Sequence, residues 1–172
     1  MKKINWFDTV AHGLLHLIVW GSLFYFIYSL SVSTARADEV LTQSERIVAL
    51  TILGEARGEG KCGMYAVACV IQKRASERNL TPARVCLQPY QFEIWNAGKG
   101  KVKKESQLYH LWKSKMTPYA RQLARALCSG KKFSQTYTGG ANHYCTLKTN
   151  NYWTKKGTVT KIIGNHKFFI LE

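Results

Sequence analysis

The chain has 172 residues, with 25 Lys and Arg against 10 Asp and Glu, so its formal net charge is +15. With 46% hydrophobic and 12% aromatic residues it is too apolar to be disordered, and its length suits one globular domain plus a short extra segment. The basic charge points to an anionic polymer as partner. Carboxylates are scarce. Beyond residue 40 they are Glu45, Glu55, Glu59, Glu77, Glu93, Glu105 and Glu172.

Residues 1–37 have the pattern of a targeting segment. A basic start precedes an apolar stretch over residues 14–30, and Ala35-Arg36-Ala37 fits a signal peptidase site. The segment is a signal peptide or, because the stretch approaches the ~20 residues that span a bilayer, an uncleaved inner-membrane anchor over residues 10–32. Either way we expect residues 38–172 to be exported to the periplasm or cell envelope. Removing three bases and one acid with the segment leaves them with a net charge of +13.

Export changes the interpretation of the cysteines, since disulfides form in oxidising compartments. The five are Cys62, Cys69, Cys86, Cys128 and Cys145. An odd number leaves one unpaired within a single chain, and no pair has metal-ligand spacing. A Cys69–Cys86 bridge is the first choice, with buried small apolar residues as the alternative.

Helices are expected first along the exported part. Thr42-Gln-Ser-Glu45 has the form of a capping box and starts a helix over residues 43–56. Glycines then loosen the chain before a helix over 62–78, whose apolar residues recur at helical spacing. Thr-Pro pairs open two further helices. The remaining predicted helices cover residues 82–87, 105–115 and 117–128, with a solvated loop over 97–104.

Strands are expected last. From Ser134 onward the helical period vanishes, and Gly164-Asn165 is a two-residue turn of the type that β-hairpins favour. The hairpin joins residues 158–163 and 166–171, and residues 143–145 form a further short strand. Helices followed by a small sheet predict an α+β domain.

The first candidate for chemistry is Glu55, within Gly54-Glu-Ala-Arg-Gly-Glu-Gly60. A carboxyl placed against an apolar wall has a raised pKa and can act as a general acid. The alternative is a solvated turn with a local Glu–Arg contact. Aromatic and amide side chains also gather over residues 89–96, 137–144 and 152–153, which is typical of sugar sites, although such aromatics also belong to cores.

Five segments carry a resemblance to a known family. They are Ile52–Gly60, Ala66–Arg74, Gln91-Phe92 with Trp95, Gly140–Tyr144, and Ile163-Gly164 with His166 and Phe168. In this order they resemble the cell wall hydrolase family of the spore cortex-lytic enzyme SleB, in a signal-led form like bacteriophage endolysins, which are lysis proteins. Cys145 departs from the pattern, because relatives often have an aromatic residue or histidine there.

The resemblance implies a lysozyme-like, lytic-transglycosylase-type α+β fold, with a helical lobe followed by a small antiparallel sheet. It implies that residues 38–172 cleave peptidoglycan glycan strands at the MurNAc-GlcNAc bond, with Glu55 as catalytic acid and no cofactor. We expect Asn142, His143 and Tyr144 to line the cleft. We expect Phe92 and Trp95 to stack on sugar or to form a wall of the pocket.

Two mechanisms stay open. Glycosidases generally use two carboxylates, and in the sequence the near partner of Glu55 is Glu59, as in a muramidase. The glycines around Glu59 argue against one continuous helix, and we favour a structural role for it. A lytic transglycosylase needs only one glutamate, because the muramic acid's own 6-hydroxyl attacks and forms a 1,6-anhydro ring.

Other classes are weaker. A zinc N-acetylmuramoyl-L-alanine amidase would need ligands such as Cys128, His143 and Cys145, and we predict no metal. A Cys-His peptidase lacks a recognisably activated cysteine. The lysines at 99–104 fit a nucleic-acid-binding protein, although export argues against it. A non-catalytic wall-binding or virion structural protein is a further alternative. We expect a monomer that binds peptidoglycan and no nucleic acid, and that meets the membrane only through an uncleaved N-terminal segment.

Overall fold

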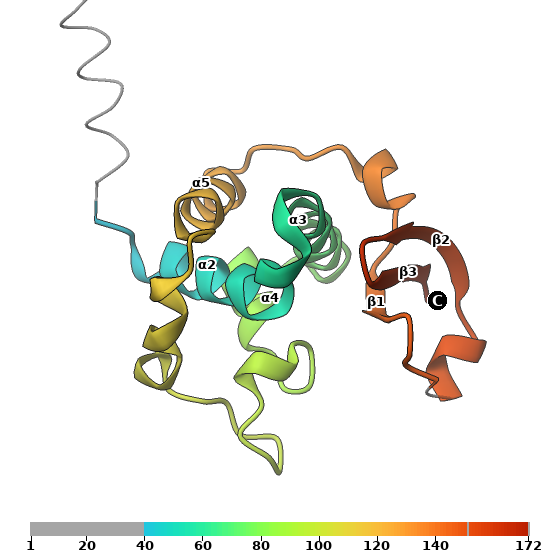
Figure 1. The fold of residues 1–172 in the computed structure, drawn as a ribbon, viewed down its shortest axis with the longest axis horizontal. Coiled ribbons are helices and arrows are strands. Elements are labelled where there is room, and N and C mark those ends of the chain that lie inside the picture. The colour runs from blue at the N-terminus through green and yellow to red at the C-terminus, as the bar shows by residue number, and fades with distance from the viewer. Residues whose placement is uncertain (1–39, 151, 172) are drawn as a thin grey trace, which may run out of the picture. The chain divides into compact units, whose positions relative to one another are not determined.

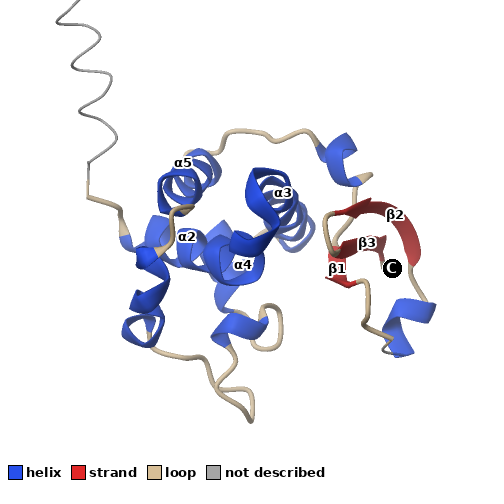
Figure 2. Ribbon diagram, viewed as in Figure 1, coloured by secondary structure: helices blue, strands red, loops and turns tan. Residues whose placement is uncertain are grey.

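The computed structural model describes residues 40–150 and 152–171. Residues 41–172 form one compact unit, in which a group of helices stands beside a small sheet (Figures 1 and 2). The predicted targeting segment lies outside the described residues, so its export and cleavage stay predictions. Among the described helices none is long and apolar enough to span a bilayer.

The helix α2 (Gln43–Ala56) forms the centre of the helical group. Its first turn has the predicted capping box. Thr42 accepts a hydrogen bond from the backbone N–H of Glu45, and the Glu45 carboxylate accepts one from that of Thr42. Most of α2 is buried, because it packs against α3 (Gly60–Arg78), α4 (Pro82–Leu87) and α5 (Thr117–Cys128) (Figure 1). The capping box therefore sets the start of α2, and packing against three helices holds it in place.

The predicted break after α2 is confirmed. One 3-10 turn, η2 (Arg57–Glu59), separates α2 from α3, and Gly60 has φ 66° at the junction. That positive φ favours glycine. The helix α3 starts at Gly60, slightly earlier than predicted.

Two further 3-10 helices follow α4, namely η3 (Glu93–Trp95) and η4 (Glu105–Lys113). The helix predicted over 105–115 is a 3-10 helix and ends at Lys113. The buried residues of η4, Leu108 and Leu111, are three apart, which is the period of a 3-10 helix. The predicted loop over 97–104 contains one isolated β-bridge between Asn96 and Val102.

The sheet has three antiparallel strands, β1 (His143–Thr146), β2 (Thr158–Ile163) and β3 (His166–Ile170). The predicted hairpin is confirmed, but the strand order is β1-β3-β2, so the last strand lies in the middle. The 3-10 helices η5 (Gln135–Thr138) and η6 (Tyr152–Lys155) lie before β1 and β2 in the chain. Phe168 of β3 packs on Ala66 and Val70 of α3, which fastens the sheet to the helices. The expected α+β class is confirmed.

Candidate active site

Two cavities adjoin the last turn of α2. The large cavity, about 690 Å³, is lined from α2, α3, η3, β1, η6 and β3. The small cavity, about 410 Å³, is lined from α2, η2, η3, η4, β1 and β3. Both are lined by Glu55, Glu93, Thr146 and His166. Glu55 therefore lies at the junction of the two cavities, where a long ligand passing through both would meet it.

The Glu55 carboxyl is held by one hydrogen bond on each oxygen. The Tyr144 hydroxyl donates to Oε2 over 2.9 Å, and the Ile94 backbone N–H donates to Oε1 over 3.2 Å. Burial raises the pKa of Glu55 above its usual value, although these two hydrogen bonds and the charge of Arg74 oppose the rise, and Glu93 adds to it. A carboxyl that keeps its proton toward neutral pH is suited to general acid catalysis.

Gly54 allows η3 to come so close to Glu55. A Cβ on Gly54 would collide with the side chain of Ile94. The missing side chain lets Ile94 sit against the end of α2, where its N–H reaches the Glu55 carboxyl. The glycine that precedes the acid is thus part of how the acid is held.

Tyr144 reaches Glu55 from the sheet. It lies in β1, with its ring edge-on to His166 at 5.4 Å between centroids and tilted against Phe168 at 5.6 Å. Burial raises the pKa of Tyr144 well above its usual value, so the phenol stays protonated and acts as the donor to Glu55. This hydrogen bond is one of the links between the sheet and the helices.

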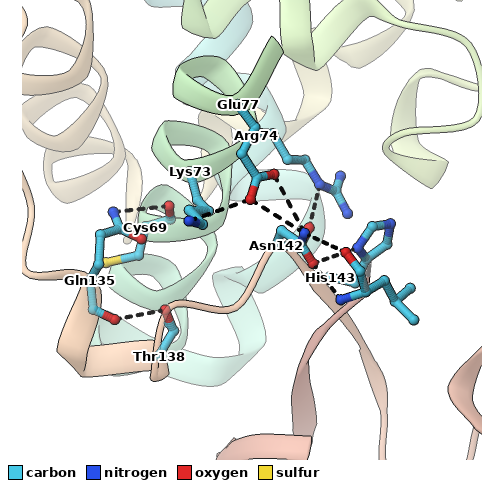
Figure 3. A network of polar contacts seen from close by, with 9 residues as sticks. Cys69, Lys73, Arg74, Glu77, Gln135, Thr138, Asn142 and His143 are labelled. Carbon is cyan, nitrogen blue, oxygen red and sulfur yellow. Dashed lines mark hydrogen bonds and ion pairs between the residues drawn. The ribbon is translucent and has the colours of Figure 1, made fainter. Parts of the chain in front are cut away.

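Arg74 fastens β1 to α3 beneath the cleft (Figure 3). Its Nε donates to the carbonyl of Asn142 over 2.6 Å and its Nη1 to the carbonyl of Gln91 over 3.1 Å, while the guanidinium lies over the Phe92 ring at 5.1 Å. Its side chain is buried and also lines the large cavity. Arg74 lies in the Ala66–Arg74 segment of the resemblance, but no role was predicted for it from the sequence. Its charge, seven residues after Val67 on the apolar face of the helix, is the signal that could have indicated one.

Asn142 forms a second fastening in the same network. Its Nδ2 donates to the carbonyl of Leu171 over 2.8 Å, and its Oδ1 accepts from the Leu171 N–H over 2.9 Å, which ties the start of β1 to the chain end. Weaker contacts reach the Glu77 carboxylate (Figure 3). Asn142 is buried and lines neither cavity. The expected substrate contact is therefore replaced by a positioning role.

The structure contradicts the expectation that Phe92 and Trp95 stack on sugar. They are 1% and 2% exposed and line neither cavity. The Trp95 indole N–H donates to the buried Thr51 hydroxyl over 2.8 Å, and Phe92 packs in the core and carries Arg74. Both rings lie in an irregular segment, but they are large and apolar, and the chain at η3 turns them into the core.

Exposed aromatic side chains come instead from neighbouring positions. Tyr90, 68% exposed, and Tyr152, 75% exposed, line the large cavity together with Trp153. Tyr90 has φ 64°, an unusual conformation for a residue with a side chain, and its N–H donates to Asn96 Oδ1 over 3.2 Å. The sequence marked these segments as aromatic but did not show which rings face outward.

The structure places two histidines in the cleft. His143 lines the large cavity, as expected, and burial with Arg74 and Arg78 lowers its pKa to about 4, so its ring is neutral at pH 7. Its Nδ1 hydrogen-bonds to Asn142 Oδ1. The sequence noted His166 without assigning it a role. It is 7% exposed and its Nδ1 has no partner among the described atoms.

Glu59 is not in the cleft. Its carboxylate accepts hydrogen bonds from the Asn165 backbone N–H over 2.8 Å and from Asn165 Nδ2 over 3.2 Å, and it lines neither cavity. The backbone bond lowers the pKa of Glu59. Glu59 thus ties the β2–β3 turn to the start of α3. The second carboxyl that lines the cleft is Glu93.

The five cysteines form no disulfide, and burial disfavours the thiolate in three of them. All five are unpaired, so the expected Cys69–Cys86 disulfide is absent. Burial raises the pKa of both thiols to about 12 and that of Cys128 to about 11, which disfavours the reactive thiolate. Within residues 40–150 and 152–171, no three His, Cys, Asp or Glu side chains come together as metal ligands, so a zinc amidase finds no ligand set there.

A half-buried carboxyl with a raised pKa, held by a hydrogen bond on each oxygen at the junction of two cavities, defines a candidate site for acid catalysis. The Cell Wall Hydrolase family model matches residues 58–169, which is more than half of the chain. The chain belongs to the cell wall hydrolase family. The match begins three residues after Glu55, so the role of Glu55 rests on its geometry.

Solved structures share the fold. The chain is similar to the catalytic domain of the germination-specific lytic transglycosylase SleB from Bacillus anthracis, with a TM-score of 0.54 and 22% identity, over 77% of this chain and 98% of that one. It is also similar to the catalytic domain of the Bacillus cereus SleB protein, with a TM-score of 0.50 and 22% identity, over 77% and 94%. These matches confirm the expected lysozyme-like fold. Among curated proteins none matches.

Proposed function

We propose that this chain cleaves the glycan strand of peptidoglycan at the MurNAc-GlcNAc bond, with Glu55 as general acid. The carrying observation is the Glu55 carboxyl, whose pKa is raised by burial and whose two oxygens are held by Tyr144 and Ile94 at the junction of two cavities. Family membership supports the substrate class. The exposed tyrosines of the large cavity offer faces on which sugar rings stack.

We propose further that the reaction is a lytic transglycosylation. Glu55 gives its proton to the departing glycosidic oxygen as the bond to the anomeric carbon breaks. The resulting carboxylate, stabilised by the Tyr144 hydroxyl and the Ile94 N–H, then accepts the proton of the muramic acid 6-hydroxyl as that oxygen bonds to the same carbon. No water is consumed and one glutamate suffices. The fold shared with a protein described as a lytic transglycosylase supports this choice.

Hydrolysis is the second candidate, because Glu93 lines both cavities beside Glu55. Two carboxyl groups facing one bond can act as acid and base, or as acid and nucleophile. In this version Glu93, and not Glu59, is the second carboxyl. Glu93→Gln tests it, since a hydrolase that uses Glu93 loses activity and a transglycosylase that uses Glu55 alone keeps it.

Mass spectrometry of digested purified peptidoglycan tests the reaction. We expect muropeptides that end in 1,6-anhydromuramic acid, one water lighter than reducing ends, and we expect Glu55→Gln to release neither. Reducing ends from the wild-type protein would favour hydrolysis, and free stem peptides would favour an amidase. Unchanged cleavage by Glu55→Gln would contradict the assignment of the acid.

The setting of the reaction is also a proposal. The basic start, apolar stretch and Ala35-Arg36-Ala37 of residues 1–37 support export to the periplasm or cell envelope, and a signal-led enzyme of this kind suits a bacteriophage lysis protein. Fractionation of cells that express the full chain tests it. A shortened protein in the periplasm indicates cleavage, a full-length protein in the inner membrane indicates an anchor, and cytoplasmic protein contradicts export.

A further inference from the structure

The small cavity is lined by basic side chains that the proposed acid catalysis does not require. Arg57, Lys103 and His110 line the small cavity and not the large one. The carboxyl groups that line it, Glu55 and Glu93, line the large cavity as well and so lie at the junction. Away from the junction, the small cavity is basic.

Neither permanent cation has a carboxylate partner in the ion pairs of the described residues. Nη1 of Arg57 donates to the carbonyls of Leu53 and Gly54, each over 3.3 Å, which fixes the guanidinium at the end of α2. The Lys103 N–H donates to the carbonyl of Trp95 over 2.8 Å, which fixes its backbone. The ion pairs recorded among the described residues involve neither cation. Their charges remain available to a ligand.

The large apolar side chains that line the small cavity are aliphatic. Ile94, Leu108 and Leu111 line it, whereas the exposed aromatic rings line the large cavity. Sugars are recognised by aromatic faces and by many hydrogen-bonding groups. A lining of aliphatic and cationic side chains fits instead a short peptide that has small aliphatic side chains and carboxylates.

We propose that the small cavity binds the acidic stem peptide of the glycan strand, with Arg57 and Lys103 contacting its carboxylates. This rests on the proposed function. Because the small cavity adjoins Glu55, a group attached to the sugar at the cleaved bond reaches it, and the stem peptide is an acidic group attached there. The enzyme accordingly prefers strands whose stem peptides are present and charged.

The experiment compares two forms of soluble peptidoglycan fragments. In one form the stem-peptide carboxylates are intact, and in the other they have been converted to amides with carbodiimide and ammonia. For the wild-type protein we expect kcat/KM to be several-fold lower on the amidated form. Lys103→Gln should lower kcat/KM about fivefold on the charged form and leave the amidated form unchanged, because the partner charge is already gone there.

Two controls define the role of Lys103. Lys103→Arg keeps the charge and should keep the preference. Lys132→Gln removes the same charge from an exposed lysine that lines neither cavity, and should leave the preference unchanged. Equal losses by Lys103→Gln on both forms, a wild-type protein without preference, or an equal effect of Lys132→Gln would each overturn the proposal.

Binding separates this proposal from the proposed function. In the Glu55→Gln background, affinity for the charged and amidated fragments is measured by calorimetry. Suppose that the wild-type protein cleaves neither form, while the Glu55→Gln protein binds the charged form more tightly and loses this preference with Lys103→Gln. The proposed function then fails and the peptide site stands. If both forms are cleaved and bound equally, the peptide site fails and the proposed function stands.

Discussion

The hydroxyl of Tyr144 donates a hydrogen bond to the Glu55 carboxyl across 89 positions of sequence, and this bond joins the sheet to the last turn of α2. Because Arg74 and Asn142 fasten β1 to α3 and to the chain end, the hydroxyl is held where the acid needs it. The Glu55 carboxyl is thus held in position from both the helices and the sheet.

Tyr144→Phe should lower kcat about tenfold, because the ring packing stays while the carboxylate formed after proton transfer loses one donor. The hydroxyl lowers the pKa of Glu55, so its removal raises that pKa. Since the acid must be protonated, the high-pH limb of the kcat/KM profile should move to higher pH. Tyr109→Phe is the control, at an exposed tyrosine that lines neither cavity. A limb that stays in place would show that the hydrogen bond does not tune Glu55.

Glu55→Gln should stabilise the fold in a pH-dependent way. The folded protein raises the pKa of Glu55, so the wild-type protein has its full stability below the ordinary glutamate pKa and loses some as pH rises through the folded value. A neutral glutamine avoids that loss. Thermal unfolding should show a melting temperature a few degrees higher than the wild type at pH 8 and nearly equal at pH 4. The same difference at both pH values would contradict a raised pKa.

Gly54→Ala should cost about 1–3 kcal/mol of unfolding free energy, because its Cβ would collide with Ile94. The displaced Ile94 N–H would also leave Glu55, and kcat should fall. Gly58→Ala is a matched control, since nothing lies within 4 Å of the Cβ added there. Thermal unfolding and kcat are measured for both variants. Equal effects would mean that the contact with Ile94 is not the cause.

Glu59→Gln should leave kcat/KM within about threefold of the wild-type value, because the Glu59 carboxylate lines neither cavity and faces Asn165. The exposed contact should contribute less than about 1 kcal/mol to stability. Assays beside Glu55→Gln provide the comparison. A loss as deep as that of Glu55→Gln would restore Glu59 as a second catalytic carboxyl.

Tyr90→Ala should raise KM about tenfold with a smaller effect on kcat, because stacking on sugar is worth about 1–1.5 kcal/mol. Tyr90→Phe keeps the ring and should keep KM. Tyr109→Ala removes another exposed tyrosine, outside both cavities. Steady-state kinetics on soluble glycan fragments measure both constants. A KM unchanged in Tyr90→Ala would remove Tyr90 from the sugar site.

Local signals in the sequence were sufficient for several elements. The Thr42–Glu45 capping box started α2, the glycines after Glu55 ended it, and Gly164-Asn165 set the hairpin turn. Each of these signals acts within a few residues, through a cap, a backbone angle or a turn. The same reasoning marked Glu55, because an acid beside an apolar run and between glycines is unusual within its own neighbourhood.

The aromatic residues show where that reasoning ends. Phe92 and Trp95 are buried while Tyr90, in the same short segment, faces the large cavity. In an irregular segment the spacing of residues does not show which side chains point into the core and which point toward solvent. The direction of each ring follows from partners far away in the chain, such as Thr51 for Trp95 and Arg74 for Phe92.

The sequence by itself determined the basic charge and the order of helices and strands, and it indicated Glu55 as the candidate acid, because these follow from composition and from patterns among near neighbours. Only the tertiary structure decided that Tyr144 orients Glu55, that Glu59 supports a turn, and that the cations of Arg57 and Lys103 line a separate cavity. These relationships join segments distant in sequence, and packing between the lobes sets them.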